Sequence, residues 1–184
     1  MKKPYLIFAT FLIVISTTSA AHEIGEYYQG GVIFYVDSTL EHGLIAAASD
    51  QGAATWRKRQ YNTGATHDGL YSGKYNTEHI LDALGPTGSY AARVAAACSN
   101  GGYSDWYLPS KYELNLMYEQ RFIIGEFSLG EDIYQGVYWS STVEYNSETK
   151  AEYQAWVQKF SDKGRTFSLP LDSHGARIRA IRSF

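Results

Sequence analysis

The pattern of apolar and polar positions divides the chain into strand-like ends and a helical middle. The stretch GEYYQGGVIFYVD carries β-branched and aromatic residues on both sides of Gly30-Gly31, which is typical of a hairpin. The stretch HGLIAAASD, residues 42–50, is predicted to be a buried strand. Residues 52–75 are polar, glycine-rich and irregular, so we expect a long exposed loop there.

Helical patterns occupy the middle of the chain. Two short helices are predicted over residues 76–84 and 89–98, separated by Gly85-Pro86. A third follows DWYLPSKYEL, because Pro109 ends strand pairing and Ser110 with Glu113 forms an S-x-x-E capping box. Gly125 ends this helix, whose predicted apolar stripe comprises Leu114, Met117, Tyr118 and Phe122.

The last third returns to strand periodicity. VYWSSTVEY alternates, and YQAWVQKF and RTFSLPL are predicted to be further strands, with turns at residues 146–152 and 162–164. In the terminal ARIRAIRSF, Arg177 and Arg179 share a face. Strands first, helices next and hairpins last predict an α+β domain with a mostly antiparallel sheet. The residues expected on one face of the first of these strands are Val137, Trp139, Ser141 and Val143.

The first residues have the pattern of a secretory signal peptide. Two lysines precede an apolar run from about Tyr5 to Ile15, and small residues follow up to Ala20 and Ala21. The run is shorter than the ~20 residues that cross a bilayer. We therefore expect residues 1–21 to be removed, and residues 22–184 to form one secreted or periplasmic domain without a membrane span.

Charge and cysteine usage narrow the function classes. Without Lys2 and Lys3, 14 basic residues face 19 acidic ones, which disfavours nucleic-acid binding. Cys98 is the single cysteine and has no partner for an internal disulfide. Stability must then come from packing, to which 4 Trp, 16 Tyr and 8 Phe contribute.

Several motifs in order carry a family resemblance. They are GGVIFYVD, HGLIAAASDQ, WYLPSKYEL, YWSST, Ala155-Trp156 and the terminal RIRAIRSF. Together they resemble the C-terminal domain family of the Legionella collagen-like adhesin, and they extend over nearly all of residues 22–184. That family is similar to the C-type-lectin-like and formylglycine-generating-enzyme folds.

The resemblance implies a compact C-type-lectin-like domain with two to three short helices. It also implies binding of polysaccharides in adhesion, including sulfated, glycosaminoglycan-like ones. The chain has no collagen Gly-X-Y stalk, so a trimer is not implied and the oligomeric state stays open. The resemblance marks Trp106, Leu108, Pro109, Trp139 and Trp156 as mainly architectural, and the capping residues Ser110 and Glu113 complete the structural signature.

No motif points to an enzyme, a cofactor or a metal. The five histidines lack zinc-ligand spacing and are interpreted as surface or loop residues. Cys98 is interpreted as a buried thiol, and no cysteine follows it, so a formylglycine-generating oxidase is rejected. Calcium would need converging oxygens, and neither Glu131-Asp132 nor Asp172 lies in a recognised loop.

The candidate ligand-binding residues are basic and aromatic. Guanidinium groups suit sulfate and carboxylate, and the triplet at residues 57–59 lies beside Trp56. Solvated or ion-paired charge is the alternative interpretation of these residues. A neutral sugar would instead use tyrosine faces, for which Tyr61, Tyr71 and Tyr75 are candidates. The full anionic-ligand set is Arg57, Lys58, Arg59, Tyr61, Arg177, Arg179 and Arg182.

Three functions stay open at this point. A non-enzymatic polysaccharide-binding domain is the first. A protein-binding or envelope-structural module with no sugar affinity is the second, because fold does not decide function. An enzyme of unknown activity is the third; no sequence motif favours it, and substrate turnover lost in Cys98→Ala would support it.

Overall fold

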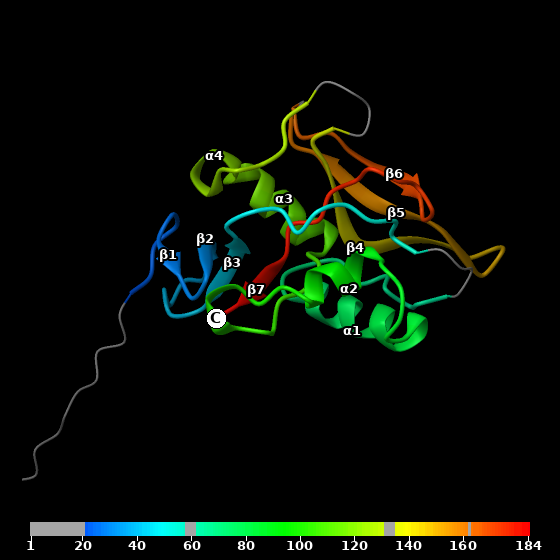
Figure 1. Cartoon of the computed structure of the whole chain (residues 1–184), viewed down its shortest axis with the longest axis horizontal. Coiled ribbons are helices and arrows are strands. Elements are labelled where there is room, and N and C mark those ends of the chain that lie inside the picture. Colours follow the sequence, from blue (N-terminus) through cyan, green and yellow to red (C-terminus); the bar gives the residue numbers. More distant parts are fainter. Residues whose placement is uncertain (1–20, 58–61, 131–134, 162) are drawn as a thin grey trace, which may run out of the picture.

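The computed structural model describes residues 21–57, 62–130, 135–161 and 163–184 (Figure 1). One antiparallel sheet contains, in spatial order, β1 (Tyr27–Tyr28), β2 (Gly31–Val36), β3 (Gly43–Ala47) and β7 (Ile181–Ser183). The other contains β4 (Val137–Asn146), β5 (Ala151–Lys159) and β6 (Thr166–Pro170). The helices are α1 (Ser72–Leu84), α2 (Ala91–Ala96), α3 (Lys111–Glu119) and α4 (Arg121–Ile124), with a short 3-10 turn η1 (Asn100–Gly102).

The α+β prediction is confirmed, with two antiparallel sheets. The predicted hairpin forms between β1 and β2, and β3 is buried along its whole length. At the close approach of β2 to β3, a Cβ on Gly31 would lie 2.1 Å from the carbonyl oxygen of Ala46, so only glycine fits there. The last strand, β7, pairs with β3 and so joins the C-terminus to the N-terminal hairpin.

The helix predictions are confirmed with shifted boundaries. The helix α1 begins at Ser72, before the predicted residue 76, and α2 is shorter than predicted. Ser110 and Glu113 form the predicted capping box at the start of α3. The helical stretch is interrupted at Gln120 and ends at Gly125, as predicted.

Two predictions about exposure are wrong. Phe122 was placed on the buried stripe, but it is 80% exposed, because α4 starts a new turn after Gln120. The long exposed loop predicted over residues 52–75 is only partly present: residues 72–75 belong to α1, and residues 52–71, where they are described, are irregular but mix exposed with buried positions. Trp56 and Ala65 are fully buried in it, since the segment crosses the core beside β4.

Alternation along the chain distributes side chains between two apolar clusters. Trp106 and Leu108 lie in the larger cluster with Trp139, whereas Tyr107 and Tyr138 belong to the smaller one. The buried indoles also find acceptors, as expected for a polar group out of water: Trp56 donates to the Ser140 carbonyl at 2.8 Å.

The two sheets lie at opposite ends of the molecule, and the helices connect them (Figure 1). The helix α3 contacts β2 of one sheet and β4 and β5 of the other, while α1 packs on α2 and β4. In the part of the chain that the structure describes, no helix has the length and apolar character to span a bilayer.

Candidate ligand-binding surface

Arg57 lies inside the protein, on a buried carboxylate. Its side chain donates to the Glu152 carboxylate at 3.3 Å and to the Glu152 carbonyl at 2.5 Å. Both side chains are almost fully buried. Burial lowers the pKa of the Arg57 guanidinium, and the nearby Glu152 charge opposes that effect. This arginine is therefore occupied in holding the chain at residue 57 on β5.

The terminal arginines also bind carboxylates of the same chain. Arg179 has a fully buried side chain that donates to Asp50 at 2.8 Å, and Arg177, which is 40% exposed, lies 3.5 Å from the same carboxylate. Arg182 is held by both oxygens of Asp105 at 2.8 and 2.9 Å. Arg177 and Arg179 both reach Asp50, although residues 178–180 lie outside the strands and Arg177 is half-exposed where Arg179 is buried.

These contacts change the role of the basic candidates. The guanidinium groups of Arg57, Arg179 and Arg182 are buried and donate hydrogen bonds to acceptors of the same chain. Few of their N–H groups are therefore left to bind an external anion. Arg57 and the Arg177–Arg179 pair use different carboxylates, Glu152 and Asp50. The other three candidates, Lys58, Arg59 and Tyr61, lie outside the described residues.

A stack of three rings lies on the surface beside α1. The His67 and Tyr75 rings are stacked with centroids 4.2 Å apart, and the Tyr75 and His79 rings are tilted with centroids 4.1 Å apart. Tyr75 is 41% exposed, and His67 is exposed as well. Such exposed rings contribute nothing to the apolar core, so their arrangement suits an external partner better than packing.

The loop that carries His67 is held at both ends. At its start, the amides of Thr63 and Gly64 donate to the Glu152 carboxylate at 2.8–2.9 Å. At its end, the Asn76 side chain bonds both the amide and the carbonyl of His67. The irregular backbone is thus pre-organised without regular secondary structure, as binding loops often are.

The start of α3 extends this surface. Tyr112, 48% exposed, donates its amide to the Asp68 carboxylate at 2.7 Å. The Lys111 ammonium lies 3.6 Å from the centre of the half-buried Trp156 ring on β5. Thr142 connects the two parts, because it donates to the His67 carbonyl and accepts from the Lys111 amide. We name the group the aromatic surface: His67, Tyr75, His79, Tyr112, Trp156 and the polar Asp68 and Lys111.

Glu113 fixes α1 and α3 against each other beneath the aromatic surface. One carboxylate oxygen accepts from the Ser110 amide of its own cap at 2.8 Å and from the Gly73 amide of α1 at 3.0 Å. Tyr107 donates its hydroxyl to the other oxygen at 3.4 Å. Burial raises the pKa of Glu113 to about 7, although the amides of Ser110, Tyr71 and Gly73 act in the opposite direction. The carboxylate serves two helix N-termini, where negative charge is favoured.

The remaining signature residues occupy the interior. Trp106, Leu108, Pro109 and Ser110 are buried, as is Trp139. Trp156 differs from them, since it is half-buried and the Lys111 ammonium of α3 lies over its ring. That position allows Trp156 to take part in binding as well as in packing.

Neither metal ligands nor a reactive thiol marks a reaction centre in the described residues. No group of three or more His, Cys, Asp or Glu side chains in that part of the chain is placed to hold a metal ion. Cys98 is a free and buried cysteine, and burial raises the pKa of its thiol, which disfavours the nucleophilic thiolate.

Sequence reasoning identified Tyr75 but not its partners. The four-residue spacing of Tyr75 and His79 on a helix was the available signal, because such residues are neighbours on one face. His67 carries no such signal, since it reaches the stack through an irregular loop. Comparison with known proteins adds nothing to the site: no protein-family model matches the chain, and no curated protein matches it either.

Proposed function

We propose that this chain is a secreted or periplasmic, non-enzymatic binding domain that recognises polysaccharide through the aromatic surface. The proposal includes a C-type-lectin-like fold similar to the C-terminal domain of the Legionella collagen-like adhesin. Two antiparallel sheets, the capped helix after Pro109 and the buried tryptophans support that likeness.

The ring stack of exposed His67 and Tyr75 with half-buried His79 carries the proposal. A sugar ring has an apolar C–H face that covers an aromatic ring, and hydroxyl edges that need hydrogen-bond partners. Asp68 and Lys111 supply an acceptor and a donor on the same surface. The combination of exposed rings and polar neighbours suits a polysaccharide better than it suits a small apolar ligand.

The same geometry favours a weakly charged or neutral polysaccharide over a sulfated one. Arg57, Arg179 and Arg182 bind carboxylates of the same chain, which leaves Lys111 as the one cation of the aromatic surface. Sulfate binding requires guanidinium or ammonium groups with free donors. Recognition by the aromatic surface therefore rests on ring contacts and hydrogen bonds more than on net charge.

The test compares Tyr75→Ala with Tyr27→Ala on a panel of neutral, carboxylated and sulfated polysaccharides. Tyr27 is 67% exposed on β1, away from the stack, and is the matched control. Because a ring contact contributes about 0.5–1.5 kcal/mol, we expect Tyr75→Ala to weaken binding roughly two- to tenfold. Unchanged affinity of Tyr75→Ala would remove the aromatic surface from the proposal.

A protein partner is the second candidate function. Phe122, Ile123 and Leu129 are 80%, 52% and 62% exposed beside α4, and exposed apolar side chains of this size are typical of protein contacts. Failure of every polysaccharide to bind, together with saturable capture of one envelope protein that Phe122→Ser abolishes, would favour this function.

A further inference from the structure

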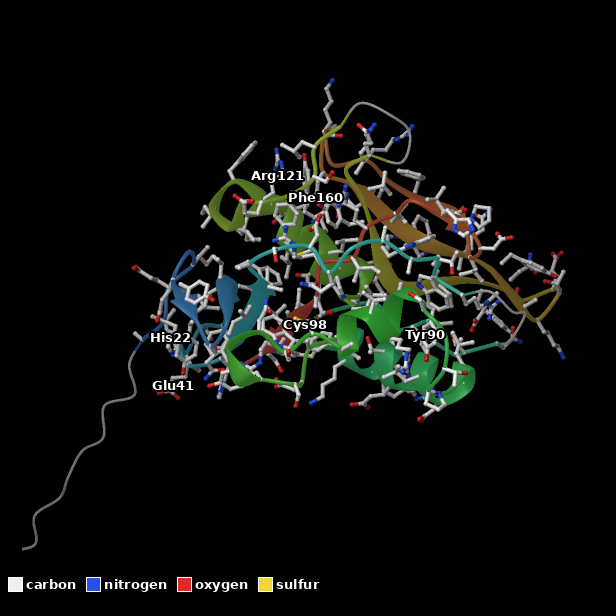
Figure 2. The ribbon with its side chains drawn as sticks, in the orientation of Figure 1. His22, Glu41, Tyr90, Cys98, Arg121 and Phe160 are labelled. Carbon is white, nitrogen blue, oxygen red and sulfur yellow. The ribbon has the colours of Figure 1, made fainter. Side chains whose placement is uncertain are left out.

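A hollow lies beside α4, apart from the aromatic surface. It has a volume of about 310 Å³ and is lined by residues from α3, α4, the segment after Gly125 and the end of β5. This volume is near the lower end of the roughly 300–1,000 Å³ range of small-molecule sites. Figure 2 shows two of its lining residues, Arg121 and Phe160, close together at the α4 side of the molecule.

The walls of this hollow are aromatic. Phe127 and Phe160 have ring centroids 4.6 Å apart, and Tyr118 meets Phe160 edge-to-face at 5.5 Å. Buried Arg179 supports this wall from behind, since its guanidinium lies 4.2 Å from the Phe127 ring and donates to the Glu126 carbonyl at 2.5 Å. The wall is thus fixed before any ligand arrives.

Two cations lie in the lining. The Arg121 guanidinium is 4.0 Å from the Tyr118 ring and 4.2 Å from the Phe122 ring, and it donates to the Tyr118 carbonyl at 3.0 Å. Lys163 belongs to the turn between β5 and β6 and is exposed. Among the described residues, no carboxylate forms an ion pair with either cation.

The lining therefore has an excess of positive charge above an aromatic wall. Among the lining residues that the structure describes, Glu126 is the single acidic one, against Arg121 and Lys163. A guanidinium that rests on ring faces keeps its outward N–H groups for a planar anion. We propose that this hollow binds a small aromatic carboxylate, with its rings against Phe127 and Phe160 and its carboxylate on Arg121 and Lys163.

The experiment uses three probes of one shape: 2-naphthoate, its neutral isostere 2-naphthamide and the cation 2-naphthylmethylammonium. Titration calorimetry on the protein lacking residues 1–21 gives their affinities. We expect 2-naphthoate to bind most tightly, and about tenfold more tightly than the amide, because only the acid makes charge-assisted hydrogen bonds. Tighter binding of the amide or the cation would overturn the proposal, as would no binding of 2-naphthoate up to about 1 mM.

Variants locate the binding. Arg121→Met and Lys163→Met remove charge and keep an apolar stem, so each should lower 2-naphthoate affinity several-fold and leave 2-naphthamide affinity unchanged. Arg165→Met is the matched control, because Arg165 also lies over a ring, that of Phe167, but does not line the hollow. Equal loss in the Arg165 variant, or no loss in the Arg121 and Lys163 variants, would contradict the assignment. Tyr75→Ala should leave 2-naphthoate binding intact, which separates this site from the aromatic surface.

Discussion

At the scale of single residues, the buried carboxylate of Glu113 joins two helices. It accepts hydrogen bonds from the first turns of both α1 and α3, and a Cβ on Gly73 would lie 2.3 Å from its nearer oxygen. The close approach of the two helices thus depends on glycine at residue 73 and glutamate at residue 113. Any larger side chain at residue 73 would push α1 away from this carboxylate.

The raised pKa of Glu113 predicts a pH-dependent stability. A carboxyl with an ordinary pKa of 4.5 when unfolded and about 7 when folded binds its proton more tightly in the folded state. Its stabilising contribution is complete below pH 4.5 and is lost as the pH rises through 7, on the order of 3 kcal/mol in total. Glu113→Gln should remove this slope from urea-unfolding free energies measured between pH 4.5 and 8. An identical slope in both proteins would show that Glu113 is not its source.

Arg179 makes a stronger prediction because its charge is fully buried. Arg179→Met leaves the carbonyls of Ala47 and Glu126 without donors and weakens the pairing of Asp50. We expect a loss of about 3 kcal/mol in the free energy of unfolding, as for other broken buried ion pairs. Arg177→Met removes the half-exposed partner of Asp50 and should lower the free energy of unfolding by less than about 1 kcal/mol. Equal losses in the two variants would contradict this difference.

The arginines also mark the limit of sequence reasoning at this scale. Strand alternation predicts that Arg177 and Arg179 share a face, and the structure shows both side chains at one carboxylate, that of Asp50, although residues 178–180 form no strand. Their partner Asp50 lies 129 residues before Arg179 in the chain, and no local pattern predicts such a pairing. The local sequence around an arginine does not indicate whether its side chain is solvated or paired with a buried carboxylate.

At the scale of elements, the loop over residues 62–69 depends on one strand residue. Glu152 of β5 accepts from the Thr63 and Gly64 amides, and Asn62 bonds the Lys150 carbonyl and the Glu152 amide. The loop has no regular secondary structure, so these bonds replace the ladder that a strand would have.

Loss of the Glu152 carboxylate should therefore loosen the loop. In Glu152→Gln, one amide replaces an oxygen that accepts N–H bonds, and Arg57 loses its counter-charge. We expect hydrogen exchange of the Thr63 and Gly64 amides to accelerate at least about tenfold, while amides of β3 keep their protection. Glu148→Gln, in the exposed turn after β4, is the control. Equal exchange rates in Glu152→Gln and wild type would show that the loop is held by other contacts.

Elements with strong local signals were predictable, and the loop was not. The capping box at Ser110 and the hairpin at Gly30-Gly31 are fixed by neighbours in the chain, which is why both predictions are confirmed. The segment around Trp56 reads as an exposed loop because its composition is polar, but its burial comes from β4 and β5, far along the sequence. The prediction for Phe122 is wrong in the opposite direction: the residue was expected on the apolar stripe but is exposed, since the stripe ends with the helix break at Gln120.

For the molecule as a whole, the aromatic surface exists only because four elements meet. His67 comes from a loop, Tyr75 from α1, Tyr112 from α3 and Trp156 from β5. Sequence reasoning named Tyr75 and Trp156 singly and for different roles, because spacing along the chain does not bring them together. The tertiary fold therefore supplies the proposed binding surface.

Net charge of the whole molecule gives a last prediction that distinguishes the two modes of polysaccharide binding. The whole chain carries 16 basic and 19 acidic side chains, and Arg57, Arg179 and Arg182 are bound internally. A sulfated polymer would meet overall repulsion, and ring contacts are not screened by salt. Affinity for a polysaccharide bound through the aromatic surface should thus change less than about twofold between roughly 0.05 and 0.5 M NaCl.

Retention on heparin and on a neutral polysaccharide resin, each eluted over a salt gradient, checks this prediction. Salt-insensitive retention on the neutral resin, lost in Tyr75→Ala, is the expected result. Strong retention on heparin with steep salt dependence would contradict it, because that behaviour requires several unpaired cations at the site. Lys58→Ala combined with Arg59→Ala would then identify the cations, since this pair belongs to the basic triplet whose first member, Arg57, is already bound to Glu152.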